Sequence, residues 1–231
     1  MGNKHSYHQK IMKGKKYFQF VICGTDTNIG KTIISSLFVR GLSSFYWKPI
    51  QSGIEEETDS ETVLRISKIK KEKILRESYI FKTPVSPHWA AEIDKEKVNK
   101  TKLELPLIDD HLIIETAGGL MVPITRDFLQ IDQIKDWKLP IILVCRSSLG
   151  TLNHTLLSIE ALRKRNINII GLVINGEKHL DNPKTLAQFT GLPIIAEIPL
   201  LKKVDSQSLD ILWQELNIKR NLELSFSAIS F

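Results

Sequence analysis

The sequence predicts an α/β domain built on a doubly wound, mostly parallel sheet flanked by helices. Six short apolar runs, rich in Ile, Val and Phe and mostly free of internal charge, recur along the chain. Such runs are typical of strands buried on both faces, as in parallel sheets. Longer amphipathic segments lie between them. This strand–helix alternation over the whole length indicates one doubly wound domain.

The six apolar runs give the expected strands. In chain order they are Tyr17–Cys23, Phe45–Ile50, His111–Glu115, Pro140–Cys145, Asn168–Ile174 and Pro193–Ile198. Cys23 and Cys145, the two cysteines of the chain, each end a run. That placement favours small buried side chains over a disulfide or a metal site, and suits a reducing, cytoplasmic setting.

Helices are expected between the strands. The candidates are Lys31–Leu42, Thr58–Ser67, Thr151–Arg165, Pro183–Thr190 and Asp205–Leu216. The third carries leucine and isoleucine at intervals of three to four residues and ends in basic residues, as a helix C-terminus favours. Gly191 is a stop signal for the fourth. From Tyr79 to Pro106 the pattern weakens and prolines recur, which predicts a surface excursion over the sheet edge.

The net charge of +6 comes mainly from the N-terminus. Residues 1–16 hold five lysines and no acid, so of 32 basic residues 27 remain in the rest of the chain, against 26 acidic ones. We therefore expect residues 1–16 to form a poorly ordered basic extension and residues 17–231 a single, nearly neutral domain. A start at Met12 is an open alternative. Nucleic acid and membrane are not expected partners, because the body is neutral and no apolar stretch reaches about 20 residues.

The segment Gly24–Thr32 has the form of a phosphate-binding loop. It follows the first strand and opens the first helix, where backbone N–H groups and the helix dipole attract anions. Lys31 can reach the β- and γ-phosphates, and the Thr32 hydroxyl can bind Mg²⁺. Five residues separate Gly24 and Gly30, one more than in the general motif. The context predicts a P-loop NTPase-like fold that binds ATP or GTP with Mg²⁺.

Carboxylates are expected beside this loop, because Mg²⁺ held with a nucleotide usually takes one or two of them. Glu115 is the first candidate, since it ends an apolar strand at the edge where open α/β sheets bind ligands. Gly118 follows it and permits close backbone approach to a phosphate. Asp59 lies in an acidic stretch, most of which is expected to face solvent.

Lys48 ends the second strand, at the same rim as the phosphate loop. Its neighbours Phe45, Tyr46, Trp47 and Ile50 are large and apolar, so its stem is expected to be held rigidly. A positioned ammonium beside ATP can stabilise an anionic nucleophile. A plain surface charge is the alternative for a lysine at a strand end.

With these motifs the sequence resembles the dethiobiotin synthetase family. The matching segments are Gly24–Thr32, Trp47–Gly53, Ser86–Ala91, Glu115–Pro123, Gly150–Thr155 and Asn175, in family order. They cover residues 17 to about 200. The five-residue loop spacing is the family's own form, so the match to the family is more specific than the general motif.

The resemblance implies roles for particular residues. Lys48 and Lys31 look catalytic, and Thr32, Asp59 and Glu115 look like the Mg²⁺ site. Thr27 and Ser52 look like groups that bind substrate, and Asn175 looks like the adenine reader. The remaining nucleotide contacts implied are Asn28, Ile29, Gly30, Ile33, Thr116, Ala117, Gly118, Gly176, Pro199, Leu200 and Leu201. Many relatives have Gly where this chain has Thr116, and His88 has no assigned role.

The resemblance also implies how the substrate carboxylate is held. The helix start at Gly150, Thr151 and Asn153 has no acidic residue nearby, and a helix N-terminus is an anion site. In the family this helix belongs to the partner subunit. We therefore expect a homodimer with active sites at the interface.

The reaction implied is an ATP-dependent cyclo-ligation. An amine of 7,8-diaminononanoate takes up CO₂ (or bicarbonate) as a carbamate, ATP phosphorylates it to a carbamic–phosphoric anhydride, and the second amine closes the ureido ring. Two other interpretations share the fold. Partition-type switching ATPases often have an extra lysine in the loop, which this one lacks. Cobyrinate amidases need a glutaminase domain for which 231 residues leave no room.

Overall fold

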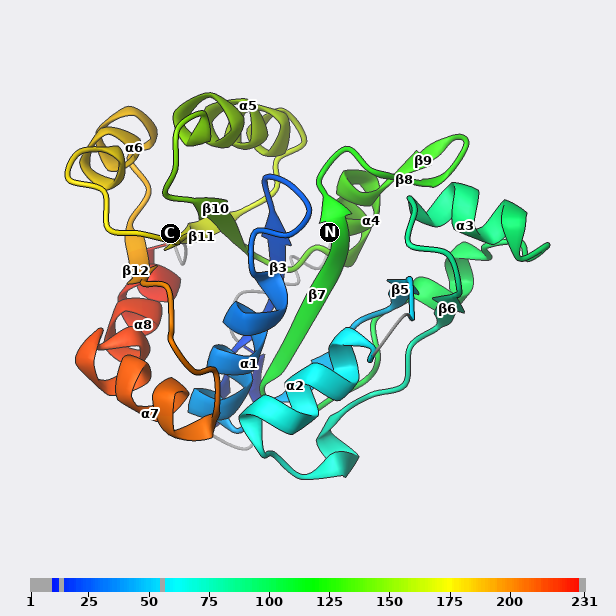
Figure 1. Cartoon of the computed structure of the whole chain (residues 1–231), viewed down its shortest axis with the longest axis horizontal. Coiled ribbons are helices and arrows are strands. Elements are labelled where there is room, and N and C mark those ends of the chain that lie inside the picture. The colour runs from blue at the N-terminus through cyan, green and yellow to red at the C-terminus, as the bar shows by residue number, and fades with distance from the viewer. Residues whose placement is uncertain (1–9, 13–14, 55–56, 229–231) are drawn as a thin grey trace, which may run out of the picture.

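A six-stranded, all-parallel sheet forms the centre of the molecule (Figure 1). The computed structural model describes residues 10–12, 15–54 and 57–228. Across the sheet the strands run β12 (Ile194–Ile198), β11 (Ile169–Asn175), β10 (Ile141–Arg146), β3 (Gln19–Gly24), β7 (Leu112–Gly119) and β4 (Phe45–Trp47). Each predicted apolar run overlaps one of these strands, so the predicted fold class is confirmed. The run Phe45–Ile50 was predicted as one strand, but β4 ends at Trp47 and Ile50 belongs to a separate two-stranded sheet.

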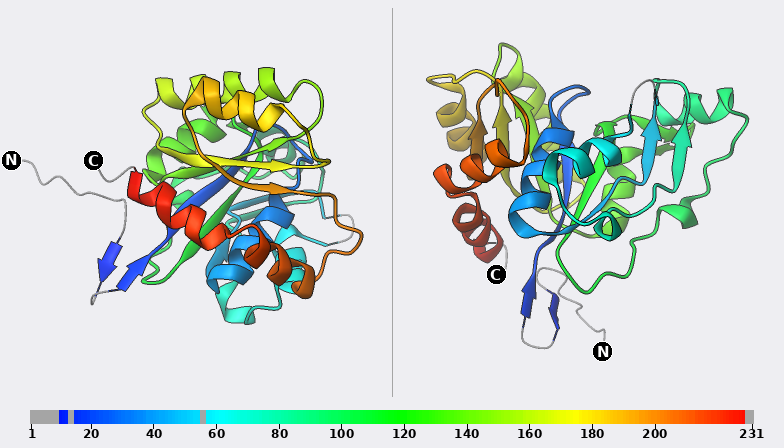
Figure 2. Two further views of the ribbon diagram at one scale, coloured as in Figure 1. Left: turned by 90° about the vertical axis from the view of Figure 1, so that its left-hand side faces the viewer. Right: turned by 60° about the horizontal axis from the view of Figure 1, so that its bottom comes forward.

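Helices cover both faces of the sheet, as Figure 2 shows. One face packs against α1 (Lys31–Leu42), α2 (Asp59–Ser67), α7 (Ser206–Glu215) and α8 (Ile218–Ala228). The other packs against α4 (Gln130–Trp137), α5 (Thr151–Lys164) and α6 (Asn182–Thr190). Each face of the sheet has its own hydrophobic core. Side chains of β3 alternate between them, with Phe20 and Ile22 packed in the core of the first face and Val21 and Cys23 in that of the second.

The five predicted helices are present, with ends that differ by one residue at most. Thr58 begins α2 as a capping box with Glu61, and Gly191 ends α6 with φ of 67°. The sequence interpretation missed α3 (Pro87–Ile93), α4 and α8. Within the described ranges, no helix is long and apolar enough to cross a membrane.

The chain between β4 and β7 builds a small subdomain with its own core. β5 (Ile50–Ser52) and β6 (Tyr79–Phe81) form a parallel pair, and α3 and two short 3₁₀ turns (Lys71–Lys73 and Lys100–Leu103) accompany them. Apolar side chains from β5, β6 and α3 meet Leu103 and Phe128 in a third buried cluster. The predicted excursion from Tyr79 to Pro106 is therefore a packed wall, with the hairpin β8 (Pro123–Thr125) and β9 (Phe128–Leu129) beside it.

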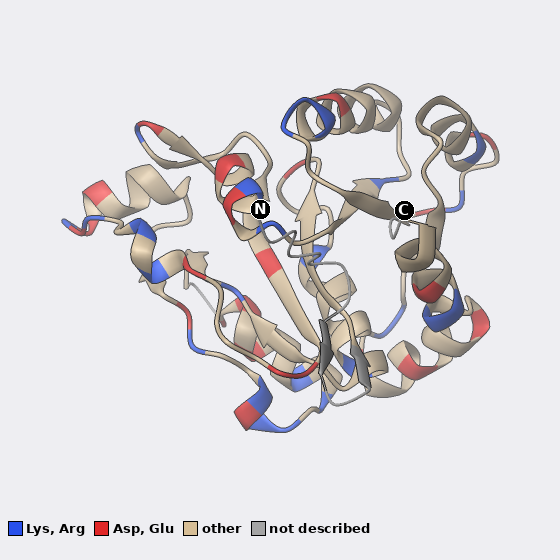
Figure 3. Cartoon of the chain, turned by 180° about the vertical axis from the view of Figure 1, so that it is seen from behind, with Lys and Arg blue, Asp and Glu red and all other residues tan. Residues whose placement is uncertain are grey.

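The N-terminal residues are described only in part. β1 (Lys10–Met12) and β2 (Lys15–Tyr17) form an antiparallel pair that projects from the sheet (Figure 2). Residues 1–9 and 13–14 lie outside the described residues, so the expected basic extension stays a prediction there. Over the described body, basic and acidic residues are interspersed along helices and loops (Figure 3).

Candidate active site

The loop between β3 and α1 is shaped by a glycine that no other residue could replace without strain. Gly30 has φ of 88°, in the left-handed region, and a Cβ there would lie 2.2 Å from Asn175 Nδ2. The same Asn175 amide donates to the Ile29 carbonyl at 2.9 Å. Thus the end of β11 braces the loop immediately before α1, whose first backbone N–H groups face the position of an anion.

Lys31 folds back over this loop. Its side chain is almost fully buried, and Nζ donates to the Asp26 carbonyl at 2.9 Å. Burial lowers the pKa of Lys31, an effect that Glu115 opposes and Lys48 reinforces. The ammonium is therefore held at the loop centre, where a phosphate would replace the carbonyl as its partner.

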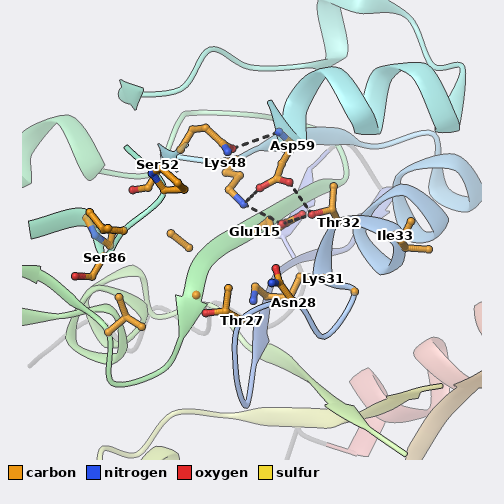
Figure 4. A pocket seen from close by; sticks show the side chains of 18 residues that line it. Thr27, Asn28, Lys31, Thr32, Ile33, Lys48, Ser52, Asp59, Ser86 and Glu115 are labelled. Atoms are coloured by element: carbon orange, nitrogen blue, oxygen red, sulfur yellow. Dashed lines mark hydrogen bonds and ion pairs between the residues drawn. The ribbon is translucent and has the colours of Figure 1, made fainter. Parts of the chain in front are cut away.

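Three oxygen-bearing side chains converge beside the loop (Figure 4). Thr32 Oγ1, in the first turn of α1, lies 3.0 Å from Asp59 Oδ1 and 3.0 Å from Glu115 Oε1. Asp59 begins α2, and Glu115 lies within β7 with no exposed surface. Residues far apart in the sequence thus come together beside the loop, although Glu115 lies in the middle of β7 and not at the end of a strand as the sequence analysis expected.

Lys48 lies between the two carboxylates. Nζ is 3.1 Å from Glu115 Oε1 and also pairs with Asp59 Oδ2 (Figure 4). Burial acts to lower the pKa of Lys48, but the two carboxylates outweigh it and raise the pKa above its ordinary value. Burial likewise opposes ionisation of Asp59, whereas Lys48 and the Thr32 hydroxyl bring the pKa of Asp59 below its ordinary value. The Lys48 ammonium and the Asp59 carboxylate therefore stabilise each other in their charged forms.

This arrangement fits a small hard cation. Mg²⁺ prefers oxygen ligands and is commonly bound by one or two carboxylates together with phosphates. Asp59, Glu115 and the Thr32 hydroxyl offer such oxygens next to the loop. Lys48 pairs with both acids and Lys31 also interacts with them electrostatically, so the acids are already balanced, and a further cation would be balanced by the phosphates of a bound nucleotide.

A cleft of about 690 Å³ opens from the loop toward the small subdomain. Among the predicted residues, those that line it are Thr27, Asn28, Gly30, Lys31, Thr32, Ile33, Lys48, Ser52, Asp59, Glu115, Ala117 and Gly118. Ser52 Oγ is buried and has no hydrogen-bond partner among the described residues, so it is available to a ligand. The cleft is large enough for a ligand of small-molecule size.

The opposite wall of the cleft was not predicted residue by residue. It consists of Gln51, Pro84, Val85, Ser86, Pro87 and Val122. Gln51, Ser86, Pro87 and Val122 fall in segments that matched the family in sequence, which was the available signal. The Ser86 hydroxyl lies 3.0 Å from His88 Nδ1 at the start of α3, so His88 has a partner at the helix start.

Several predicted residues lie outside this cleft. Thr116 and Ile29 are buried, and Thr116 Oγ1 points to the Ile22 carbonyl. Asn175 and Gly176 adjoin the end of β12, because Gly176 donates its N–H to the Ile198 carbonyl at 2.9 Å. This places them beside Pro199, which follows β12 and leads to Leu200 and Leu201. Asn175, Gly176 and Pro199 to Leu201 form a second group of predicted residues, which lies at the same edge of the sheet as the loop.

The start of α5 stands apart from the lysine–carboxylate cluster. Gly150 has φ of 91°, and both Gly150 and Asn153 are exposed, whereas Thr151 is buried and donates to the Arg146 carbonyl. None of these three lines the cleft. Their predicted contact with substrate stays a prediction.

Arg146 is a loop contact that sequence reasoning missed. It ends β10, and Nη2 lies 3.0 Å from the Thr27 carbonyl and 3.2 Å from Asp26 Oδ2. The signal was its place at a strand end on the same edge as Lys48 and Glu115. Arg146 thereby joins the loop tip to the segment that leads into α5.

The two cysteines of the chain lie in the hydrophobic core. Cys23 and Cys145 are free and buried on neighbouring strands. Burial raises the pKa of Cys23 to about 12 and that of Cys145 to about 11. Both remain thiols at neutral pH, as expected for small core residues.

The parallel sheet, the loop before α1 and the Lys31–Thr32 pair define this chain as a P-loop nucleotide-binding protein. Solved structures agree on the fold: a plasmid partition protein from Borrelia burgdorferi has a TM-score of 0.53 at 16% identity and covers 93% of this chain and 100% of its own. The septum site-determining protein MinD from Pyrococcus horikoshii, complexed with Mg-ADP, has a TM-score of 0.53 at 14% identity, over 92% and 97%. At such identities these likenesses concern the fold alone.

Curated relatives are much nearer in sequence. The ATP-dependent dethiobiotin synthetases of Brucella anthropi and of Rhodopseudomonas palustris are 44% and 46% identical, each over 82% of this chain and over 90% and 89% of their own lengths. A family model described as an AAA domain matches residues 19–208. The chain belongs to the ATP-dependent dethiobiotin synthetase family, which confirms the predicted resemblance and leaves the partition-type ATPases as relatives in fold.

Proposed function

We propose that this chain carboxylates 7,8-diaminononanoate with CO₂ and closes the ureido ring of dethiobiotin at the expense of ATP, in biotin biosynthesis. The observation that carries the proposal is Lys48, charged and held between Asp59 and Glu115 beside the phosphate loop. A fixed ammonium at this place stabilises an anionic nucleophile next to the γ-phosphate. Family membership supplies the substrate class.

The chemistry needs alignment and charge neutralisation more than covalent catalysis by the protein. One amine of the substrate adds to CO₂ and loses a proton, which gives a carbamate. A carbamate oxygen forms a bond to the γ-phosphorus while the bond from that phosphorus to ADP breaks. The second amine then attacks the activated carbonyl, loses a proton and expels phosphate, which closes the ring.

The side chains of the cleft divide this work. Lys48 and Lys31 neutralise the carbamate and the transferring phosphoryl group, and the loop N–H groups from Asn28 to Ile33 hold the phosphates. Thr32, Asp59 and Glu115 would hold Mg²⁺, which when bound neutralises the phosphate oxygens. Thr27 and the unpartnered Ser52 hydroxyl, which line the same cleft, would bind the substrate.

The adenine is proposed to lie against the second group of residues at the sheet edge. Asn175 and Gly176 at the end of β11, and Pro199 to Leu201 after β12, would surround the base. Their backbones are joined by the bond from Gly176 N–H to the Ile198 carbonyl, and Asn175 also braces the loop. Leu200 is 67% exposed, so its side chain is open to a base.

The substrate carboxylate is proposed to bind at the start of α5 in the partner subunit of a homodimer. Gly150 and Asn153 are exposed and absent from this chain's own cleft, which supports a role across an interface. Mixing Lys48→Ala protein with Asn153→Ala protein tests the arrangement. Restored activity in the mixture supports shared sites, whereas additive residual activity of the two variants contradicts them.

Isotopically labelled bicarbonate tests the reaction itself. The purified chain, given Mg²⁺·ATP, labelled bicarbonate and the diamine, should place the label in the urea carbon of a cyclic product detected by mass and NMR. An unlabelled product, or phosphate released with no cyclic urea, contradicts the proposal.

A further inference from the structure

The carboxylate of Glu115 has a third donor that neither the phosphate loop nor Lys48 explains. Oε1 accepts from Thr32 Oγ1 at 3.0 Å and from Lys48 Nζ at 3.1 Å. Oε2 accepts from the Tyr46 hydroxyl at 2.9 Å. Glu115 has no exposed surface, so water does not take the place of any of these partners.

The two strands place this donor by their register. β4 pairs in parallel with β7, and Tyr46 lies opposite Ile113, two residues before Glu115. Because side chains alternate along a strand, Tyr46 and Lys48 point to one side, where Ile113 and Glu115 also point. One stretch of chain therefore brings a hydroxyl and an ammonium to the two oxygens of one carboxylate.

The tyrosine ring is fixed on every side. It has no exposed surface and belongs to the core that α1 and α2 close with Phe38, Val63 and Ile66. Its backbone is held by β7 on one edge and by the bond from Leu75 N–H to the Tyr46 carbonyl on the other. A hydroxyl on such a ring has one position, so the hydrogen bond sets the direction of the carboxylate.

We propose that Tyr46 is a positioning residue for the cation site: by holding Glu115 Oε2, it turns Oε1 toward Thr32 and toward bound Mg²⁺. The inference rests on the proposed binding of Mg²⁺·ATP at this site. Tyr46 lines no part of the cleft, and so acts through Glu115 alone. Without the hydroxyl, Oε2 becomes a buried acceptor with no donor, and the carboxylate turns to share Lys48 or Thr32.

The variant Tyr46→Phe removes one oxygen atom and keeps the ring. Partners that orient metal ligands typically contribute about 10- to 100-fold in metal affinity. We expect the Mg²⁺ concentration for half-maximal ATP binding, measured by titration calorimetry, to rise about tenfold or more. Binding of ATP in the presence of EDTA should change by less than about twofold, because the loop and Lys31 are untouched.

Tyr79→Phe is the matched control. Tyr79 is also buried, and its hydroxyl accepts the Asn99 backbone N–H at 2.7 Å, but in the core of the small subdomain. Both variants lose one buried tyrosine hydroxyl, so unfolding midpoints recorded for each show that folded proteins are compared. The Mg²⁺ requirement should rise only in Tyr46→Phe.

Two results would overturn the inference: an unchanged Mg²⁺ requirement in folded Tyr46→Phe, or an equal rise in Tyr79→Phe. The titration needs no diamine. The Mg²⁺ titration therefore tests the role of Tyr46 separately from the proposed reaction, which is tested by the labelled urea product.

Discussion

The Lys48 ammonium lies 3.1 Å from Glu115 Oε1 and at the same time pairs with Asp59, so one buried cation contacts two acids. Removing one partner from such a buried set leaves an uncompensated charge, which is strongly unfavourable. Lys48 thus favours the ionised form of Asp59 and holds both side chains in place. In the proposed reaction, Mg²⁺ would neutralise the two acids and leave the Lys48 ammonium to face an anionic carbamate.

Lys48→Ala should lower the diamine-dependent rate of ADP release by roughly 100- to 1,000-fold, because fixed charges at developing anions contribute on that scale. ATP binding should largely survive, since Lys31 and the loop remain. Stopped assays and calorimetry measure the two quantities. Lys70→Ala, at an exposed lysine, should leave both unchanged. A Lys48→Ala protein with near-normal turnover would remove Lys48 from the mechanism.

Thr32→Val should weaken Mg²⁺-dependent ATP binding by at least about tenfold, or about 1.4 kcal/mol. The change removes the hydroxyl that faces both Asp59 and Glu115 and keeps the shape of the side chain. Thr32→Ser keeps the hydroxyl and should stay near the parent in the same titration. Equal affinities in the two variants would show that the hydroxyl is not a ligand.

Gly30→Ala should abolish measurable ATP binding. Its φ of 88° costs an alanine about 1–2 kcal/mol, and the new Cβ would meet Asn175 Nδ2 at 2.2 Å, which displaces the brace of the loop. Gly191→Ala carries similar strain at φ of 67° with nothing within 4 Å. This control should lose some stability against urea and keep ATP binding. Binding retained by Gly30→Ala would contradict the proposed loop geometry.

Arg146→Ala should raise the KM for ATP a few-fold with little effect on kcat. Arg146 ties the loop tip through Thr27 and Asp26, but it is 48% exposed, and exposed ion pairs contribute at most about 1 kcal/mol. Arg126→Ala breaks an exposed pair with Glu92 away from the cleft and should change neither constant. An unaltered KM in Arg146→Ala would mean that the loop holds its shape unaided.

The pH dependence of stability should carry a signature of His111. Burial lowers the pKa of His111, Asp110 opposes this, and its Nδ1 accepts the Phe18 N–H at 2.8 Å, so the folded state favours the neutral ring. The unfolded chain therefore binds more protons just below its ordinary pKa of about 6.5. Stability from this group is complete above that pH and is lost as pH falls toward the folded pKa. The free energies of unfolding of wild type and His111→Asn, measured with urea, should converge as pH falls from 7 to 5. A difference that stays constant over this range would contradict the prediction.

Much of the fold could be predicted because the sheet is buried on both faces. Its strands are apolar throughout, and Lys31–Leu42 and Thr58–Ser67 carry clear start signals. Helix α4 escaped detection because Leu129 stands at its N-cap, with no polar side chain to announce it. Helix α8 follows α7 after a single turn at Asn217, which has φ of 49°; an asparagine there can signal the end of a helix, but not that a second helix begins directly after it.

The site divides in the same way. Lys31, Thr32, Lys48, Asp59 and Glu115 could be proposed from the sequence, because the family resemblance implies a role for each. Lys31, Thr32 and Asp59 lie at helix starts and Lys48 follows β4, but β7 continues past Glu115 to Gly119. Tyr46 could not be predicted, since its role depends on strand register, whereas Arg146 was missed although its place at the end of β10 was a signal. The part of the opposite wall of the cleft from Pro84 to Pro87 is positioned by the packing of a small separate core. The periodicity of apolar residues in the sequence does not reveal that packing.

The most direct test of the central claim is ADP release by the purified chain with Mg²⁺·ATP and bicarbonate, with and without 7,8-diaminononanoate. The proposed synthetase predicts release that depends on the diamine and matches the cyclic urea formed, mole for mole. Slow ATP hydrolysis indifferent to the diamine would contradict it, and would leave a nucleotide-binding fold without the proposed reaction.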